Sequence, residues 1–247
     1  MARFIDQLLD AICVVDGEGR FIFVSAACER IFGYTPREMV GKAMLEMVVP
    51  EDRARTLQRA NEIMSGHPTR DFENRYIRKD GQVVHIMWSA RWSEADQLRI
   101  AVARDITERK QAQSMQAALY AISEAAHTAE DLLSLFQLIH QIIGELLSAT
   151  NFSVAMHDET NDQLSFPYYT GDYDEASELQ QTSVSTLCAE VIRSREPLLL
   201  EPETLASLPE ELRAFNDSNG ACWLAVPLNS HKGTIGALVL KSNPDGA

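Results

Sequence analysis

Alternation of apolar and polar side chains is clearest between residues 70 and 110 of the chain. A run rich in Phe, Tyr and Ile ends at Lys79-Asp80-Gly81, and a second run covers residues 83–92. In the second run the even-numbered positions are apolar and most odd-numbered positions are polar, which predicts a strand with one buried face. Asp-Gly favours the positive φ angles of a tight turn, so we expect the two runs to pair as an antiparallel hairpin.

A third strand and a long helix are expected directly after this hairpin. Glu94-Ala95-Asp96 forms a turn that leads into a strand at residues 98–102. Asp105 is expected to cap the helix, because a carboxylate at a helix N-terminus accepts hydrogen bonds from backbone N–H groups and lies at the positive end of the dipole. The sheet would therefore continue into a helix with no loop between them.

Apolar residues at four-three-four spacing predict that this helix covers residues 105–127, a rod of roughly 35 Å. The apolar seam consists of Met115, Leu119, Ile122 and Ala126. It would either pack on the second half of the chain or pair with the same helix of another copy. Thr128 is then expected to cap a second amphipathic helix, whose apolar row is Leu132, Phe136, Ile139, Ile143 and Leu146.

Charge is divided unequally between the two halves of the chain. Residues 1–110 carry 17 Lys and Arg against 17 Asp and Glu, whereas residues 111–247 carry 5 against 19. The net charge of −14 therefore belongs to the second half, which indicates two domains. An acidic surface repels nucleic acid, so no nucleic-acid partner is expected. No apolar run reaches the roughly 20 residues of a membrane span, and a cytoplasmic location is expected.

The first 110 residues resemble the PAS family of sensory domains. The segments that carry the resemblance are residues 11–16, 20–24, 25–34 and 49–53, the hairpin, and Asp105-Ile106-Thr107-Glu108-Arg109-Lys110. The resemblance implies a five-stranded antiparallel sheet that cups a small cavity, with a helix that leaves the last strand and carries signals. On this basis the cavity wall is expected to include Tyr76, Ile86 and Trp88. The joint with the helix is expected at Asp105, Ile106 and Thr107.

Residues that bind the best-known cofactors of this family are missing. A flavin photosensor needs a Cys in an Asn-Cys-Arg-Phe type segment, but this chain has Met44-Leu45-Glu46 there. A haem domain needs an axial His in its long helix, which is expected at residues 51–65 and contains none. We interpret His67 as a loop side chain and His85 as a side chain on the outer face of its strand. Flavin and haem are therefore disfavoured.

Residues 115 to about 242 resemble a GAF domain, a second sensory fold of bacterial signalling proteins. Strands are expected at residues 151–157, 163–169, 198–200, 222–228 and 234–240, and helices at residues 183–195 and 209–212. The segments that carry the resemblance are residues 119–126, 151–156, 164–169, 223–228 and 233–240. The closing C-terminal helix of the family is missing, so we expect the sequence to be the front part of a longer protein.

Four residues of this second domain are candidates for the lining of a small-molecule cavity: Phe166, Tyr168, Cys188 and Trp223. Aromatic residues at strand spacing are also ordinary core residues, so both interpretations stay open. A bilin-binding GAF domain needs a Cys followed by His, but neither Cys188 nor Cys222 has one, so bilin is disfavoured. The four cysteines show no metal-binding spacing and are interpreted as free thiols.

Catalytic motifs are absent from the sequence. It contains no Gly-x-x-x-x-Gly-Lys phosphate loop, no His-Glu-x-x-His zinc motif and no Gly-x-Ser-x-Gly elbow. The nucleotide boxes of histidine kinases and the Gly-Gly-Asp-Glu-Phe and Glu-Ala-Leu motifs of cyclic di-GMP enzymes are also missing. The chain itself is therefore not expected to be an enzyme.

Together these features predict an α+β chain of two domains, each a central antiparallel sheet with flanking helices. The expected parts are a PAS-like domain at residues 1–110, a connecting helix at 105–127 and a GAF-like domain at 115–247. We expect a sensory input module of a bacterial signalling protein, which forms a homodimer through Leu119 and Ile122 and passes ligand or partner binding to an output domain. That output would be a histidine kinase, a diguanylate cyclase or a phosphodiesterase. The alternative is an interaction and dimerisation adaptor with filled cavities and no ligand.

Overall fold

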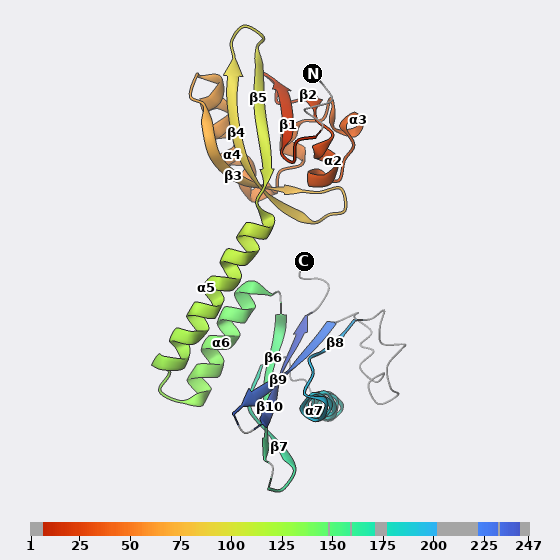
Figure 1. Cartoon of the computed structure of the whole chain (residues 1–247), viewed down its shortest axis with the longest axis vertical. Coiled ribbons are helices and arrows are strands. Elements are labelled where there is room, and N and C mark those ends of the chain that lie inside the picture. Colours follow the sequence, from red (N-terminus) through yellow and green to blue (C-terminus); the bar gives the residue numbers. More distant parts are fainter. Residues whose placement is uncertain are drawn as a thin grey trace. The chain divides into compact units, whose positions relative to one another are not determined.

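The computed structural model describes residues 7–147, 149–158, 160–170, 177–201, 222–231 and 233–242. The chain divides into two compact units, Met1–Gln113 and Ser114–Ala247. Each unit is built on a five-stranded antiparallel sheet with flanking helices (Figure 1). The predicted α+β class, with one central sheet in each of two domains, is therefore confirmed.

The sheet of the first unit has the strand order β2-β1-β5-β4-β3, and all neighbouring strands are antiparallel. Its strands are β1 (Ala11–Asp16), β2 (Phe21–Val24), β3 (Thr69–Ile77), β4 (Val83–Ser93) and β5 (Leu98–Asp105). Its helices are α2 (Ala27–Phe32), α3 (Pro36–Met39), the 3-10 turn η1 (Met44–Glu46) and α4 (Pro50–Met64). Because α4 packs against β3 and β4, the core of this unit lies between α4 and the sheet.

The hairpin predicted from alternation is present. β3 and β4 pair in antiparallel register on either side of the turn, where Gly81 has a φ of 86°. Along β4 the side chains of Val84, Ile86 and Trp88 are buried, whereas Ser89 is exposed. The two-residue period of a strand therefore directs the apolar side chains into the core, as the sequence predicts.

A buried carboxylate joins α4 to β3. Asp52 near the start of α4 accepts hydrogen bonds from the Arg75 backbone N (2.8 Å), Nε (3.1 Å) and Nη2 (3.1 Å). Arg55 Nη2 lies 3.2 Å from the same carboxylate. The hydrogen bonds from Arg75 hold the pKa of Asp52 below its ordinary value, although burial acts in the opposite direction. The charged form of Asp52 therefore stabilises the folded unit.

Acid should destabilise this unit through Asp52. Because the pKa is lowered by folding, the stabilisation is complete above the ordinary pKa of 3.8 and is lost as the pH falls through the folded-state pKa. Asp52→Asn should lower the free energy of unfolding by about 2 kcal/mol at pH 7, because it weakens hydrogen bonds to a charged group. Urea titrations from pH 7 to pH 3, followed by fluorescence of Trp88 and Trp92 in a Trp223→Phe background, measure both effects.

Glu62→Gln is the control for this prediction, because Glu62 forms an exposed pair with Arg59 on the same helix. Exposed pairs of this kind contribute about 0–1 kcal/mol. Equal losses of stability in the two variants at pH 7 would contradict the role assigned to Asp52.

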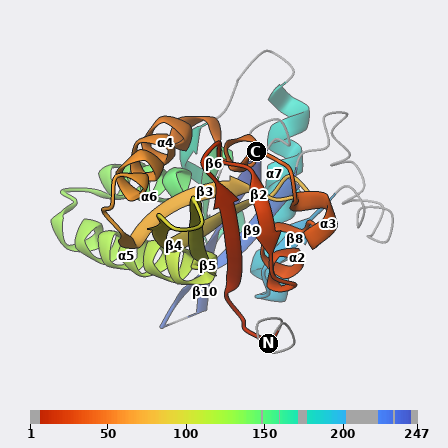
Figure 2. The ribbon, with the colours of Figure 1, turned by 90° about the horizontal axis from the view of Figure 1, so that it is seen from above.

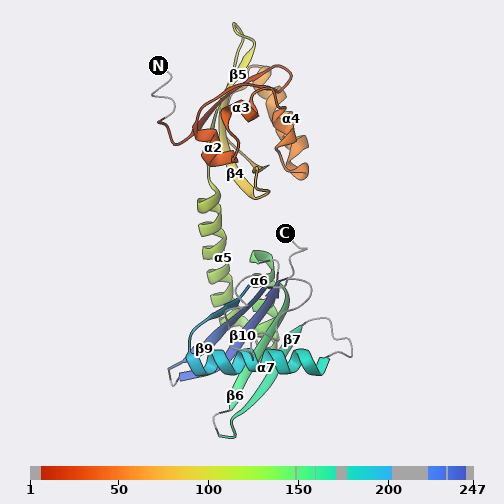
Figure 3. The ribbon, with the colours of Figure 1, turned by 90° about the vertical axis from the view of Figure 1, so that its right-hand side faces the viewer.

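The sheet of the second unit has the strand order β7-β6-β10-β9-β8 and is also antiparallel throughout. Its strands are β6 (Ala149–Asp158), β7 (Gln163–Thr170), β8 (Leu198–Leu200), β9 (Cys222–Ser230) and β10 (Gly233–Ser242), each close to its predicted range. α7 (Ser177–Ser194) begins six residues before the predicted helix and lies across β9 and β10 (Figure 3). The short helix predicted at residues 209–212 lies outside the described residues.

A single unbroken helix, α5 (Thr107–Thr128), begins in the first unit and continues into the second. Asp105, the predicted cap, lies two residues before the helix, and its Oδ1 accepts a hydrogen bond from the backbone N of Thr107, the first helical residue (2.9 Å). The backbone N of Ile106 donates to the carbonyl of His85 on β4 (2.9 Å). The first turn of α5 is therefore bonded directly to the sheet. No helix in the described ranges is long and apolar enough to cross a membrane.

The cap predicted for the second amphipathic helix is wrong. Thr128 is the last residue of α5, and its hydroxyl donates to the carbonyl of Glu124 (2.9 Å). Asp131 is the N-cap of α6 (Leu132–Leu146), because its carboxylate accepts a hydrogen bond from the backbone N of Ser134 (2.7 Å). A Thr in the last turn of a helix can bond to the carbonyl four residues earlier, so its cap-like sequence did not mark a helix start. The short turn makes α5 and α6 an antiparallel hairpin (Figures 1 and 2).

Candidate functional site

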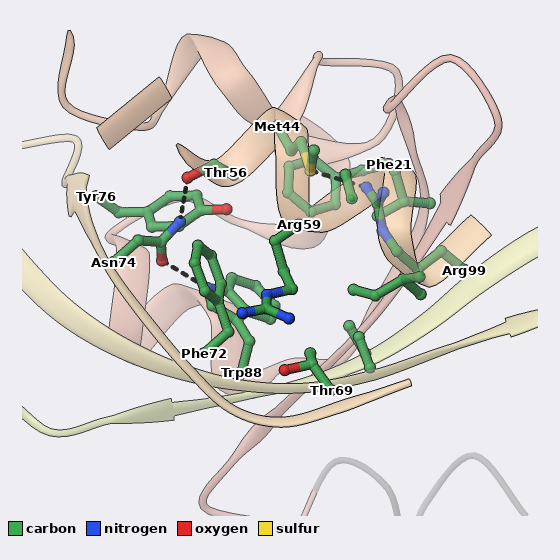
Figure 4. A pocket seen from close by; sticks show the side chains of 15 residues that line it. Phe21, Met44, Thr56, Arg59, Thr69, Phe72, Asn74, Tyr76, Trp88 and Arg99 are labelled. Atoms are coloured by element: carbon green, nitrogen blue, oxygen red, sulfur yellow. Dashed lines mark hydrogen bonds between the residues drawn. The ribbon is translucent and has the colours of Figure 1, made fainter. Parts of the chain in front are cut away.

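A cavity lies inside the first unit, between α4 and the sheet (Figure 4). Its volume, measured as the space open to the centres of water-sized spheres, is about 40 Å³. Since one water needs roughly 10–15 Å³ on this measure, there is room for about three waters or for one organic molecule of the same small size. The wall is mostly apolar, and its residues are Val15, Phe21, Met44, Thr56, Arg59, Ala60, Ile63, Thr69, Phe72, Asn74, Tyr76, Trp88, Ala90, Arg99 and Ala101.

Two of the three residues expected on the cavity wall are there, namely Tyr76 and Trp88. Ile86 is fully buried in the same core but is not part of the wall. It pairs with Asp105 at the end of β5, whereas Trp88 and Ala90 lie further along β4. The strand face was therefore predicted, but the position of the cavity along the strand was not.

A chain of hydrogen bonds fixes the polar part of the wall. Trp88 Nε1 donates to Asn74 Oδ1 (2.8 Å), and Asn74 Nδ2 donates to Thr56 Oγ1 (2.9 Å). The Thr56 hydroxyl donates in turn to the carbonyl of Asp52 (2.7 Å). All of these side chains are buried, so each polar group needs its partner. The chain holds the Trp88 ring in one orientation and connects β4, β3 and α4.

Aromatic rings form the apolar end of the cavity. The ring centroid of Tyr76 lies 5.4 Å from that of Phe32 and 5.5 Å from that of Trp88. Burial raises the pKa of the Tyr76 hydroxyl, so this group is neutral and can donate a hydrogen bond at ordinary pH. Such a surface favours a flat or branched apolar ligand.

The strand that lines the cavity also contacts the connecting helix. Phe72 and Asn74 of β3 face the cavity, and Glu73 between them faces the other side of the sheet. Glu73 Oε1 lies 2.7 Å from Arg109 Nη2, and its Oε2 lies 2.6 Å from Lys110 Nζ, both in the first turns of α5. The hydrogen bond from Lys110 lowers the pKa of Glu73 and keeps it ionised. Three consecutive residues therefore join the cavity wall to α5.

The joint predicted at Asp105, Ile106 and Thr107 lies in the same place. The Thr107 hydroxyl accepts a hydrogen bond from the His85 backbone N (3.0 Å), and the backbone N of Ile106 donates to the His85 carbonyl. Sequence reasoning missed Glu73 as part of this joint. The sequence does show that Glu73 lies between two inward-facing residues and therefore faces outward. It does not show that the start of α5 lies near β3, because that depends on the order of the strands in the sheet.

The predicted apolar seam of α5 is partly exposed. Met115 and Leu119 are 56% and 62% exposed, Ile122 is half-buried, and Ala126 is exposed. Ala118 and Ala125 are the buried residues of this helix instead. Small side chains therefore make the close contacts inside the unit, and the larger apolar side chains of the seam face outward.

The four candidate residues of the second unit belong to two different clusters. Phe166, Cys188 and Trp223 belong to the apolar cluster that includes the buried face of α7, whereas Tyr168 packs with Phe136 of α6. A β-bulge in the pairing of β6 with β7 falls between the two β7 residues and breaks the simple alternation of faces. They therefore do not line one cavity.

Cys188 is a buried thiol of the α7 helix. Burial raises its pKa to about 12, so at neutral pH it is protonated and a poor nucleophile. Tyr168 has a different environment, because its hydroxyl lies 3.0 Å from His140 Nδ1. The burial of Cys188 and the contact between Tyr168 and His140 are both typical of a packed core.

Comparison with known proteins matches both units to families. The model of the PAS fold family matches residues 5–111, and the model of the GAF domain family matches residues 129–247. A crystal structure of a PAS domain from Colwellia psychrerythraea is 25% identical, with a TM-score of 0.40, over 43% of this chain and 94% of that one.

Two relatives are histidine kinases. The blue-light-activated histidine kinase of Brucella ovis is 32% identical over 117 residues, which are 47% of this chain and 23% of that protein. The sensor histidine kinase TmoS of Ectopseudomonas mendocina is 28% identical over 150 residues, which are 57% of this chain and 15% of that protein. The match thus spans less than a quarter of either relative.

Proposed function

The chain consists of a PAS domain followed by a GAF domain, and we propose that it is the sensory input region of a bacterial histidine kinase. In this proposal a small molecule in the PAS cavity changes the position of α5 relative to the PAS sheet, and α5 passes the change through the GAF domain to the output. The likeness to two histidine kinases favours that output over a cyclic di-GMP enzyme. In this proposal the chain itself regulates the output domain and does not catalyse a reaction. It acts in the cytoplasm.

One observation carries the proposal: Glu73 binds Arg109 and Lys110 of α5 while its neighbours Phe72 and Asn74 line the cavity. A ligand that presses on either neighbour moves the same strand segment that holds the helix. Coupling between the cavity and α5 requires a structural element with two arrangements, and both sites must favour one arrangement over the other. This segment of β3 is such an element in the proposal.

Dimerisation is part of the proposal. Met115 and Leu119 are one helical turn apart on α5, so they form a continuous apolar stripe that faces outward. The same helix of a second copy is the partner that would cover the stripe. Parallel helices from two copies would then carry the signal together.

No flavin, haem or bilin is part of the proposal. The name of the Brucella relative refers to blue light, but here Met44 stands in the segment where a flavin photosensor has its Cys, and its side chain lines the cavity. Room for about three waters does not accommodate a flavin ring system. His85 lies on the strand face opposite the cavity, so it is not placed to bind haem there.

A fusion of the whole chain to a histidine kinase output tests the proposal without knowledge of the ligand. Ala101→Leu adds a branched side chain to the cavity wall and so replaces a ligand. Kinase autophosphorylation should change by about fivefold or more, the usual lower range of coupling between sites. Ala54→Leu on the exposed face of α4 is the matched control and should leave the activity unchanged.

The adaptor alternative has one observation in its favour, the small size of the cavity. Under that alternative the cavity transmits nothing. Equal autophosphorylation of the native, Ala101→Leu and Ala54→Leu fusions, with all three folded, would favour the adaptor and contradict the sensor.

A further inference from the structure

The cavity of the PAS domain presents almost no polar surface, although several residues of its wall are polar. These polar groups are bonded to one another. Trp88 Nε1 donates to Asn74 and Asn74 Nδ2 donates to Thr56, as Figure 4 shows, and the Tyr76 hydroxyl interacts with the Asn74 side chain. In the part of the chain that the structure describes, no fully buried side-chain nitrogen or oxygen of the wall lacks a hydrogen-bond partner. The wall therefore has no buried polar group that requires a ligand as its partner.

The two arginines of the wall do not present their charges to the cavity. Arg59 is paired with Glu62 (2.8 Å), and its side chain is 44% exposed, so its charge is in contact with solvent. Arg99 is buried, and its Nη2 donates to the sulfur of Met44 (2.9 Å), which lies beside the guanidinium in Figure 4. Since the surface that faces the space is almost wholly apolar, an anion in the cavity would lose its water without gaining an ion pair.

Water is also a poor occupant of this space. A buried water needs two to four polar partners, and a cavity that lacks them stays dry. The atoms that face an empty space lose dispersion contacts, because nothing lies on the other side. An apolar molecule restores those contacts and removes its own surface from water, so it is the occupant that the wall favours.

The volume of the cavity sets the size and the affinity of that molecule. A volume of about 40 Å³ holds about three waters, which corresponds to a molecule of about three non-hydrogen atoms. Very small ligands reach a known upper limit of binding free energy per atom, and for three atoms this limit gives a dissociation constant of about 0.5 mM. The molecule therefore has to reach roughly millimolar concentrations to act as a signal.

We propose that the PAS cavity binds a neutral hydrocarbon of about three carbon atoms, which lies against the rings of Phe72 and Trp88 and against Ile63 of α4. Aromatic rings of the wall favour a flat molecule, such as propene. Contact with Phe72 places the ligand against the neighbour of Glu73. This inference rests on the proposed role of the cavity as the ligand site and names the chemical class of the ligand.

Three probes of the native whole chain separate polarity from size. Propene and formamide are both flat and have three non-hydrogen atoms, but formamide is polar. Benzene is flat and apolar but twice as large. The indole N–H signal of Trp88 is followed by NMR as each probe is added, because this group forms part of the wall. The indole N–H of Trp92, which donates to Glu94 outside the cavity, is the internal reference.

Propene should shift the Trp88 signal saturably, with a dissociation constant of about 1 mM. Formamide should bind at least about thirtyfold more weakly, because its carbonyl and amino groups would leave water and find no partner in the wall. Benzene should cause no saturable shift, since it exceeds the free volume. The Trp92 signal should not respond saturably to any of the three probes.

Ala101→Leu fills the cavity and should abolish the saturable shift caused by propene. Ala54→Leu, on the exposed face of α4, is the matched control and should keep the native dissociation constant. The comparison of the three probes uses the native chain, so it does not depend on the folding of either variant.

Four results would overturn the inference: no saturable shift with propene, equal affinities for formamide and propene, benzene binding as tight as that of propene, or unchanged propene affinity in Ala101→Leu. The autophosphorylation of the Ala101→Leu fusion uses no added ligand, so it decides the proposed sensory function separately. A changed autophosphorylation without propene binding would leave the sensory function in place and contradict only the chemical class of the ligand.

Discussion

A chain with Met115→Glu and Leu119→Glu is expected to sediment as a monomer at concentrations at which the native chain sediments as a dimer. These side chains are large outward-facing apolar residues of α5, 56% and 62% exposed. In a two-fold dimer each substitution occurs twice, so four carboxylates would replace four apolar contacts. At a loss of about 1 kcal/mol for each contact, the dimer would dissociate roughly a thousandfold more readily.

Gln113→Glu with Gln116→Glu is the matched control, since it adds the same charge to the exposed, polar side of the same helix. Analytical ultracentrifugation of the three proteins over a range of concentrations measures the dissociation constants. If the control also dissociates, general repulsion explains the result. A native chain that stays monomeric at high concentration contradicts dimerisation through α5.

Glu73→Gln is expected to separate the PAS cavity from α5 while both remain folded. The carboxylate binds Arg109 and Lys110 through charge, and a neutral amide cannot replace both contacts. The groups are about half-exposed, so the pairs contribute about 1 kcal/mol to local stability. Amides at residues 107–114 should therefore exchange with deuterium about fivefold faster in the variant.

Glu73→Gln is also expected to have a large effect on the activity of a fused kinase, although the loss of local stability is small. If Glu73 is the link, occupation of the cavity no longer reaches α5, and the response of a fused kinase disappears. Glu108→Gln changes the same charge in the first turn of α5, at a residue that is exposed, and it is the control. Equal exchange rates in Glu73→Gln and in the native chain would show that the two ion pairs do not hold the helix.

Alternation and turn residues predicted much of the PAS domain. Asp80-Gly81 fixed the hairpin, and the alternation from Val84 to Ala90 fixed the buried face of β4, because a strand with one solvated face cannot shift by one residue without exposing its apolar set. Asp105 likewise predicted the start of α5 to within a few residues.

The same reasoning would have failed for Arg99. Leu98, Ile100 and Val102 are the large apolar residues of β5, so the pattern assigns them to the core and Arg99 to solvent. In the structure Arg99 and Ala101 are buried and the three larger residues are only half-buried. Small side chains line a cavity, and the sequence pattern of a cavity wall is therefore different from that of a packed core.

The GAF domain shows a second limit. Phe166 and Tyr168 have the same parity in β7, which places them on one face of an ideal strand. The bulge between them changes the register with β6, so they belong to separate clusters. A bulge depends on the partner strand, and that partner is not visible in the local sequence.

The central claim is that occupation of the PAS cavity reaches α5 through Glu73. Autophosphorylation of four fusions to one kinase output tests it most directly: native, Ala101→Leu, Glu73→Gln and the double variant. We predict that Ala101→Leu changes the activity about fivefold or more in the native background and leaves it unchanged in the Glu73→Gln background, a non-additive cycle. An equal change in both backgrounds would contradict the claim.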